Sequence, residues 1–301
     1  MTGPVSADVP IRPTFEDFVR LAERATVVPV TRELLADALT PVLAWSTIGG
    51  GAGSYLLESV EHGEKWGRYS FVGWRPECLV RGRRGCFEVE RGGRIEARDV
   101  NDPWPVLREL MAEWTPPPAA ELGHLPRFWG GAVGYIAYDA VRTFEPTVGA
   151  RLEDADAWDF SFAVGGTLLI FDDLRQRALA VSQARIKSGA DLRATYDAAV
   201  QELSRLADEL SRPRAPRLLA PPTIRRDGPL PRSSFTPAAY RAAVETAKRY
   251  IRAGDIFQVV PSQRFSVPAE DVELFDVYRM LRAINPSPYM YLLRFPEVEI
   301  A

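Results

Sequence analysis

The stretch that decides the fold lies at residues 166–182 and reads GTLLIFDDLRQRALAVS. It holds two apolar, strand-like runs, Gly166 to Phe171 and Ala178 to Ser182, separated by a short polar segment. Two such runs joined by a polar turn are typical of a β-hairpin. The stretch therefore predicts antiparallel sheet, and a sheet of this kind must bury one face against other elements.

Strands and helices are expected on both sides of this hairpin. Further strands are predicted at 54–60, 68–73, 129–138, 256–261, 263–267 and 289–295, with a second hairpin at 86–97 around Gly92-Gly93. Helical spacing of apolar residues predicts helices at 14–25, 31–39, 105–114, 190–210, 236–254 and 274–284. The helix at 236–254 is expected to begin at the N-cap Thr236, to end at Gly254, and to bury an apolar stripe. The predicted fold class is α+β, with antiparallel β-sheets packed against helices.

The chain divides at a proline-rich segment. Residues 212–232 contain six prolines and no periodic pattern, which is typical of an extended linker. We therefore expect an α+β domain at 1–211, a linker at 212–232 and a second domain beginning at 233 and running to 301. The second part holds too few elements to enclose a sizeable core, so we expect it to be truncated.

Composition excludes several classes of protein. The 301 residues are 46% hydrophobic and 26% charged, with a formal net charge of −3, as in an ordinary soluble globular protein. The balance of charge predicts no nucleic-acid partner, and no apolar run reaches the roughly 20 residues that span a membrane. With no secretory signal, we expect a cytoplasmic protein whose thiols, Cys78 and Cys86, are reduced. Two cysteines and two histidines match no zinc-binding pattern, so no metal ligand is assigned.

Two segments have side chains suited to a small ligand. Glu58 and Ser59 stand at a strand end, where the carboxylate can accept from an ammonium group and the hydroxyl can donate to a carboxylate. In the segment Asn285-Pro286-Ser287-Pro288-Tyr289-Met290, two prolines stiffen the loop, and Tyr289 and Met290 suit a flat apolar group. Alternatively, Glu58 and Ser59 are a solvated carboxylate and a turn serine, and the loop simply leads into a core strand.

Five segments in this order resemble component I of anthranilate synthase, a family of chorismate-using enzymes. They are Leu57-Glu58-Ser59, Arg68 to Gly73, Gly130 to Tyr135, Gly254 to Val260, and Asn285 to Met290. The resemblance extends over nearly the whole chain. It implies a regulatory domain at 1–211 and the start of a chorismate-binding domain at 233–301, in stacked α/β/β/α layers.

The resemblance also implies a ligand site and a reaction. The feedback site for L-tryptophan would comprise Glu58, Ser59, Asn285, Pro288, Tyr289 and Met290. The complete enzyme would convert chorismate and ammonia to anthranilate and pyruvate, with magnesium as cofactor and a glutaminase subunit as the partner that supplies ammonia. The family's catalytic residues and magnesium ligands find no match in this chain, so we assign no catalytic residue and expect the chain alone to be inactive.

Three alternatives stay open at this stage. Component I of aminodeoxychorismate synthase, from folate synthesis, shares the scaffold. A non-catalytic module could use only its tryptophan pocket, docked on a glutaminase. A fragment unable to fold would unfold broadly and expose apolar surface.

Overall fold

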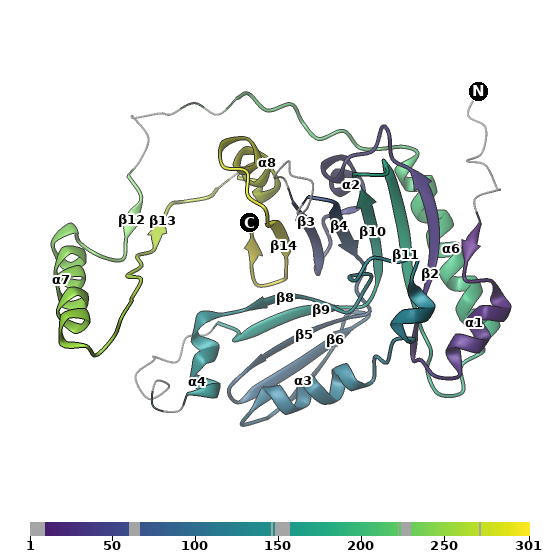
Figure 1. Cartoon of the computed structure of the whole chain (residues 1–301), viewed down its shortest axis with the longest axis horizontal. Helices are drawn as coiled ribbons and strands as arrows, with labels where there is room; N and C mark the ends of the chain where they lie inside the picture. The colour runs from purple at the N-terminus through teal and green to yellow at the C-terminus, as the bar shows by residue number, and fades with distance from the viewer. Residues whose placement is uncertain are drawn as a thin grey trace.

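The computed structural model of the chain describes residues 10–59, 67–145, 147, 157–221, 223, 230–270 and 272–301 (Figure 1). These residues form two large antiparallel sheets that are stacked and flanked by helices. The α+β fold class expected from the sequence is therefore confirmed. Among the described residues, no helix is both long enough and apolar enough to cross a membrane.

The first sheet has eight strands in the order β1-β2-β11-β10-β4-β3-β14-β15. They are β1 (Ile11–Arg12), β2 (Val27–Leu35), β3 (Ser54–Glu58), β4 (Tyr69–Trp74), β10 (Thr167–Asp172), β11 (Arg177–Arg185), β14 (Met290–Arg294) and β15 (Glu299–Ile300). The hairpin predicted at 166–182 is confirmed as β10 and β11, which pair from Thr167 opposite Ser182 to Asp172 opposite Arg177.

The second sheet has five strands in the order β7-β6-β5-β9-β8. They are β5 (Cys78–Arg83), β6 (Cys86–Arg91), β7 (Arg94–Arg98), β8 (Ala132–Ile136) and β9 (Phe160–Val164). The hairpin predicted at 86–97 is confirmed as β6 and β7. Both cysteines lie in this sheet as free thiols. A short separate ladder joins β12 (Arg232–Ser233) to β13 (Phe265–Ser266).

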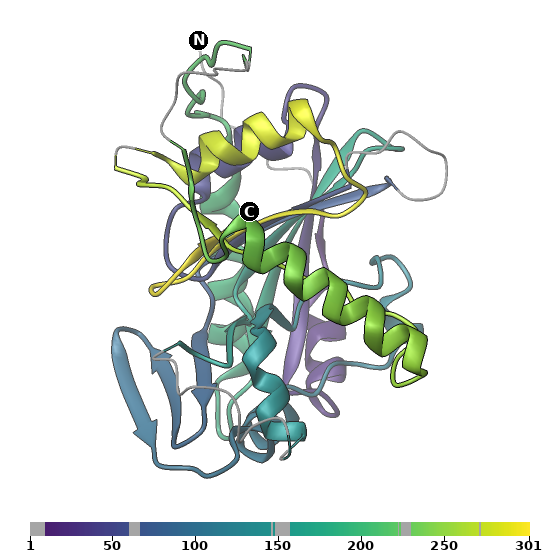
Figure 2. The same cartoon turned by 90° about the vertical axis from the view of Figure 1, so that its left-hand side faces the viewer.

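Helices complete four layers in the order α/β/β/α. They are α1 (Phe15–Ala22), α2 (Pro41–Ile48), α3 (Pro103–Ala112), α4 (Val141–Phe144), α6 (Leu192–Leu210), α7 (Pro237–Ala253) and α8 (Leu274–Ile284), with 3-10 turns η1 (Ala119–Leu122) and η2 (Tyr138–Ala140). One face of the first sheet packs under α1, α2, α6 and α8 (Figures 1 and 2). Its other face meets the second sheet, where Leu168 and Ala163 share a core. The outer face of the second sheet packs against α3 through Leu110.

One predicted helix is wrong. Residues 31–39 were expected to be helical from their leucine spacing, but 27–35 form β2, which pairs with β11 along nine residues. The β-branched run at 27–31 is buried in that pairing, and long-range burial outweighs a short local helix signal. The next helix, α2, begins only at Pro41. Its N-cap is Thr40, whose side chain accepts from the Leu43 backbone N–H.

The segment around α7 also differs from expectation. The caps of α7 are confirmed, because Thr236 accepts from the Ala239 backbone N–H and Gly254 is left-handed with φ 82°. No residue of α7 is buried, however, because the helix lies away from the two sheets (Figure 1). The strand predicted at 256–261 is wrong: these residues form neither helix nor strand, and Phe257 is 93% exposed. The strand predicted at 263–267 is reduced to β13.

The end of the chain enters the first sheet. β14 pairs with β3, and β15 pairs with β14, so strands from 233–301 lie beside strands from 1–211. The strand predicted at 289–295 and the helix predicted at 274–284 are confirmed as β14 and α8. The division of the chain into domains at 211 and 233 stays a prediction.

Candidate functional site

The two segments singled out in the sequence meet at one end of the first sheet. Glu58 is the last residue of β3, and it lies directly opposite Met290, the first residue of β14. Both side chains are buried, with exposed fractions of 6% and 8%. The antiparallel pairing therefore brings the strand end at 58–59 next to the end of the loop at 285–290, although more than half of the chain separates them.

Glu58 is held by two side chains of α8. The Tyr278 hydroxyl donates to Oε2 of Glu58, and Arg282 Nη2 donates to Oε1 at 3.1 Å. Arg282 Nε also lies 2.9 Å from Oε2. A carboxylate has about four lone-pair positions, so these contacts leave room for one more donor. The arrangement fixes the carboxylate at the end of β3.

Burial is the largest influence on the pKa values of Glu58 and Tyr278. Desolvation raises the pKa of Glu58, while the Arg282 charge and the Tyr278 hydrogen bond lower it by less. The negative charge of Asp173, in the turn after β10, adds to the increase. Burial and the adjacent Glu58 carboxylate also raise the pKa of Tyr278, so its hydroxyl keeps the proton that it donates.

Ser59 follows Glu58 and has an unusual environment. Its hydroxyl oxygen is buried, yet it has no hydrogen-bond partner among the described residues. An unsatisfied buried hydroxyl costs about 1–3 kcal/mol, so such groups are uncommon without a ligand or water to satisfy them. A ligand carboxylate at this point would accept the missing hydrogen bond.

The other predicted residues lie along the loop from α8 to β14. Asn285 ends α8 and is exposed, with its backbone N–H donating to the Leu281 carbonyl at 2.9 Å. Pro288 is half-buried, and Tyr289 is 71% exposed. The structure thus brings Glu58, Ser59 and Met290 to one place and leaves the Tyr289 ring at the surface beside them. Met290 packs in the helix-side core of the first sheet.

Sequence reasoning missed Tyr278, Arg282 and Asp173. Tyr278 and Arg282 are four residues apart, which places them on one face of α8. That spacing was visible, but it is the same spacing by which any amphipathic helix presents its buried face. Asp173 lies in the turn of the hairpin that decided the fold, and no local signal connects it to Glu58.

The described residues offer no magnesium site. No three of their His, Cys, Asp or Glu side chains come together as a metal centre requires. Two of the acidic side chains near the candidate site are already in ion pairs, Glu58 with Arg282 and Asp172 with Arg68. These residues do not fit the metal that the resemblance implies, and no chemical step is derived through it.

Comparison with known proteins gives a consistent family. A sequence model of the family described as chorismate binding enzyme matches residues 60–301. Anthranilate synthase component 1 of Aquifex aeolicus is 33% identical over 288 residues, which is 95% of this chain and 57% of that protein. The same component of Mycobacterium bovis is 37% identical over 296 residues, which is 96% of this chain and 56% of that protein.

A solved structure to which this chain is similar belongs to the same kind of protein as these sequences. The crystal structure of anthranilate synthase component I from Streptococcus pneumoniae superposes with a TM-score of 0.58 at 26% identity. The superposition covers 88% of this chain and 55% of that one. The chain therefore spans a little more than half the length of the relatives it matches.

Proposed function

The chain belongs to the chorismate binding enzyme family, and from that premise we propose that it is part of an anthranilate synthase component I and binds L-tryptophan. The observation that carries the proposal is the buried hydroxyl of Ser59, which has no hydrogen-bond partner among the described residues and directly follows the ion-paired Glu58 in the chain. A free amino acid presents a carboxylate and an ammonium group a short distance apart. Ser59 and Glu58 are complementary to that pair.

The loop from α8 to β14 supplies the apolar part of the proposed site. Tyr289 is exposed and Pro288 half-buried beside the strand end, where an indole ring can lie against them and near Met290. An indole that buries about 150–250 Å² contributes roughly 4–6 kcal/mol before ordering costs. Binding in the micromolar range therefore also requires the polar contacts at Ser59 and Glu58.

For the complete protein we propose the reaction of its matched relatives. Chorismate and ammonia would give anthranilate, pyruvate and water, in tryptophan biosynthesis, with L-tryptophan as feedback inhibitor. Ammonia would come from glutamine through a component II glutaminase subunit. Magnesium would be bound by residues other than those of the candidate site. The support is the family match and the identity of 33% or 37% to components 1 of anthranilate synthase.

Calorimetric titration of the full chain with L-tryptophan tests the proposal. We expect saturable binding that weakens about tenfold or more in Ser59→Ala, because a hydrogen bond to a charged group is lost. Ser204→Ala is the matched control, since the Ser204 hydroxyl only donates to the Val200 carbonyl one turn earlier in α6. Indole, which lacks both charged groups, should bind wild type and Ser59→Ala equally. Equal L-tryptophan affinity in Ser59→Ala and wild type would contradict the proposed site.

A further inference from the structure

A hollow opens at the end of the first sheet that also holds Glu58, on the side of β1, β2 and β11. Its volume is about 650 Å³, within the range of small-molecule sites. Four arginines line it: Arg12, Arg68, Arg175 and Arg177. They come from β1, from the residue before β4, from the turn between β10 and β11, and from the start of β11, so the sheet order gathers them from distant parts of the chain.

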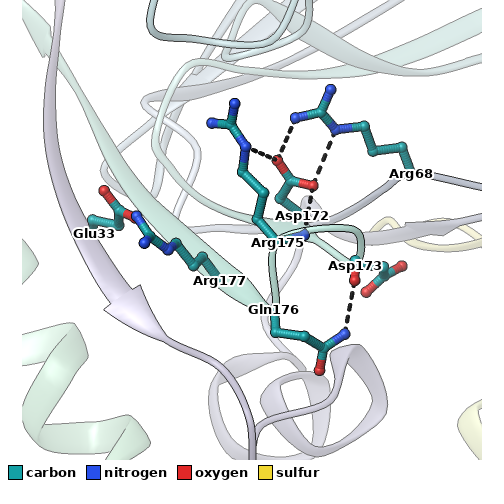
Figure 3. Close-up of polar contacts among 7 residues, drawn as sticks. All are labelled: Glu33, Arg68, Asp172, Asp173, Arg175, Gln176 and Arg177. Atoms are coloured by element: carbon teal, nitrogen blue, oxygen red, sulfur yellow. Dashed lines mark hydrogen bonds and ion pairs between the residues drawn. The ribbon is translucent and has the colours of Figure 1, made fainter.

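One carboxylate positions two of these arginines. Arg68 donates two hydrogen bonds to the Asp172 carboxylate, from Nε to Oδ1 at 3.0 Å and from Nη2 to Oδ2 at 2.7 Å. Arg175 reaches the same carboxylate from the turn, with Nε 4.0 Å from Oδ2 (Figure 3). Asp172 therefore fixes the guanidinium group of Arg68 and lies at the edge of contact with that of Arg175, and its single charge balances only one of the two.

The other two arginines add a second unbalanced charge. Arg177 forms an ion pair with Glu33 on β2. Arg12 is exposed and forms no ion pair with any acidic side chain of the described residues. His124 also lines the hollow; burial together with the charge of Arg12 lowers its pKa, which favours its neutral form, so the positive charge of the hollow comes from the arginines.

The hollow is therefore positive in a chain that is negative overall. Four guanidinium groups lie there with three carboxylates, those of Glu33, Asp172 and the adjacent Asp173 (Figure 3), whereas the whole chain has a net charge of −3. A concave surface of one sign concentrates the field and attracts ligands of the opposite charge. Guanidinium groups that are already ordered bind planar or tetrahedral oxyanions through paired N–H donors.

We propose that this hollow binds a small polyanion, a molecule with two or more phosphate or carboxylate groups. Arg12 and Arg175 are its main contacts, because their charges are the least balanced by neighbouring carboxylates. Arg68, whose guanidinium is held in place by Asp172, donates hydrogen bonds to one anionic group of the ligand. This inference does not depend on the L-tryptophan site, since no residue is shared between the two.

Titration of the full chain with pyrophosphate, and separately with citrate, tests the proposal. We expect saturable 1:1 binding at low ionic strength that weakens as salt is added. Arg12→Ala and Arg175→Ala should each weaken it about tenfold. Glu33→Gln should strengthen it, because it removes a carboxylate that competes for Arg177. Tighter pyrophosphate binding would identify a phosphate ligand, and tighter citrate binding a carboxylate ligand.

Two control variants separate a built site from general charge. Arg205→Ala on α6 matches Arg175→Ala, because each arginine is mostly exposed and lies three residues from an acidic partner. Arg94→Ala on β7 matches Arg12→Ala as an exposed strand arginine. Neither should change the affinity. Absence of saturable binding to both probes, or equal losses in the control variants, would overturn the proposal. All four arginines are partly or largely exposed, so these variants should fold.

Discussion

The hydroxyl of Tyr278 donates a hydrogen bond to the carboxylate of Glu58, a residue 220 positions earlier in the chain. Tyr278 is completely buried, and Glu58 is nearly so. The contact joins α8 to the end of β3, and it fixes the side chain that stands next to Ser59. The helix that precedes β14, α8, thus fixes a side chain of the proposed ligand site.

Tyr278→Phe removes this hydrogen bond and keeps the ring. We expect the free energy of unfolding to fall by about 1–2 kcal/mol, because a charge-assisted buried hydrogen bond is lost while packing is preserved. Urea denaturation measures the change. Tyr250→Phe, on the exposed side of α7, is the control and should stay within about 0.5 kcal/mol of wild type. A Tyr278→Phe chain as stable as wild type would mean that the hydrogen bond adds nothing to the fold.

Arg282→Ala should destabilise the chain in a pH-dependent way. It leaves a buried carboxylate without its cation, at a cost of about 1–3 kcal/mol near neutral pH. Burial already raises the pKa of Glu58 above its ordinary value, and loss of Arg282 raises it further. A raised pKa means that the folded state binds the proton more tightly, so the relative stability is greatest below the ordinary pKa and falls as pH rises.

Unfolding of Arg282→Ala and wild type at about pH 4 and about pH 7.5 measures this effect. The difference between the two proteins should be larger at the higher pH. Arg279→Ala is the control, since Arg279 pairs with Asp276 on the same helix and not with Glu58. A pH-independent difference would show that Arg282 acts through packing and not through the Glu58 charge.

Asp172→Asn has the opposite pH signature. Burial raises the pKa of Asp172, but the hydrogen bonds and charge of Arg68, with a smaller effect of Arg175, together lower it below its ordinary value. A lowered pKa contributes stability above the ordinary pKa that is lost as pH falls. Wild type should therefore lose more stability than Asp172→Asn below about pH 4, as acid unfolding monitored by circular dichroism would measure. Parallel acid transitions in the two proteins would contradict this assignment.

Gly166 should not tolerate a side chain. Its φ is +96°, and a Cβ there would lie 2.6 Å from the Arg75 carbonyl oxygen and 2.9 Å from Pro76 Cα. We expect Gly166→Ala to cost more than about 2 kcal/mol, because both the backbone conformation and the space are unfavourable. Gly189→Ala is the control: its φ is +74°, but nothing lies within 4 Å of the added carbon. It should cost about 1 kcal/mol, and equal melting temperatures for the two variants would contradict the crowding argument.

We do not expect the chain alone to form anthranilate, since no catalytic residue of the family is matched to it. Anthranilate fluorescence, measured with purified chain, chorismate, ammonium and magnesium, tests this expectation. The control is the same mixture with a complete anthranilate synthase, which should fluoresce. Product formation by the chain alone would show that its residues suffice for catalysis.

Sequence patterns predict the elements here when the signal is local. The hairpin at 166–182 and the α7 caps Thr236 and Gly254 are confirmed, because turn and cap chemistry depends on neighbouring residues. The helix predicted at 31–39 is wrong, because residues 31–35 belong to β2, whose strand state depends on pairing with β11, about 150 residues later. The exposed stripe of α7 was predicted to be buried, because periodicity alone does not identify what a helix packs against.

Some residues of the candidate site could likewise be identified from the sequence, and others could not. The residues Glu58, Ser59 and Met290 were identified through segments that resemble a family, and the structure brings them together at adjacent strand ends. Tyr278 and Arg282 were missed, since their role is created by the tertiary contact with Glu58. The arginine-lined hollow was missed for the same reason: its arginines belong to four separate segments, and only the sheet order assembles them.

A crystal structure of the full chain with L-tryptophan tests the central claim most directly. We expect one bound molecule at the end of β3, with its carboxylate accepting from the Ser59 hydroxyl, its ammonium donating to Glu58, and its indole against the loop at 285–290. Tryptophan bound elsewhere, or at that place with Ser59 still unpartnered, would contradict it.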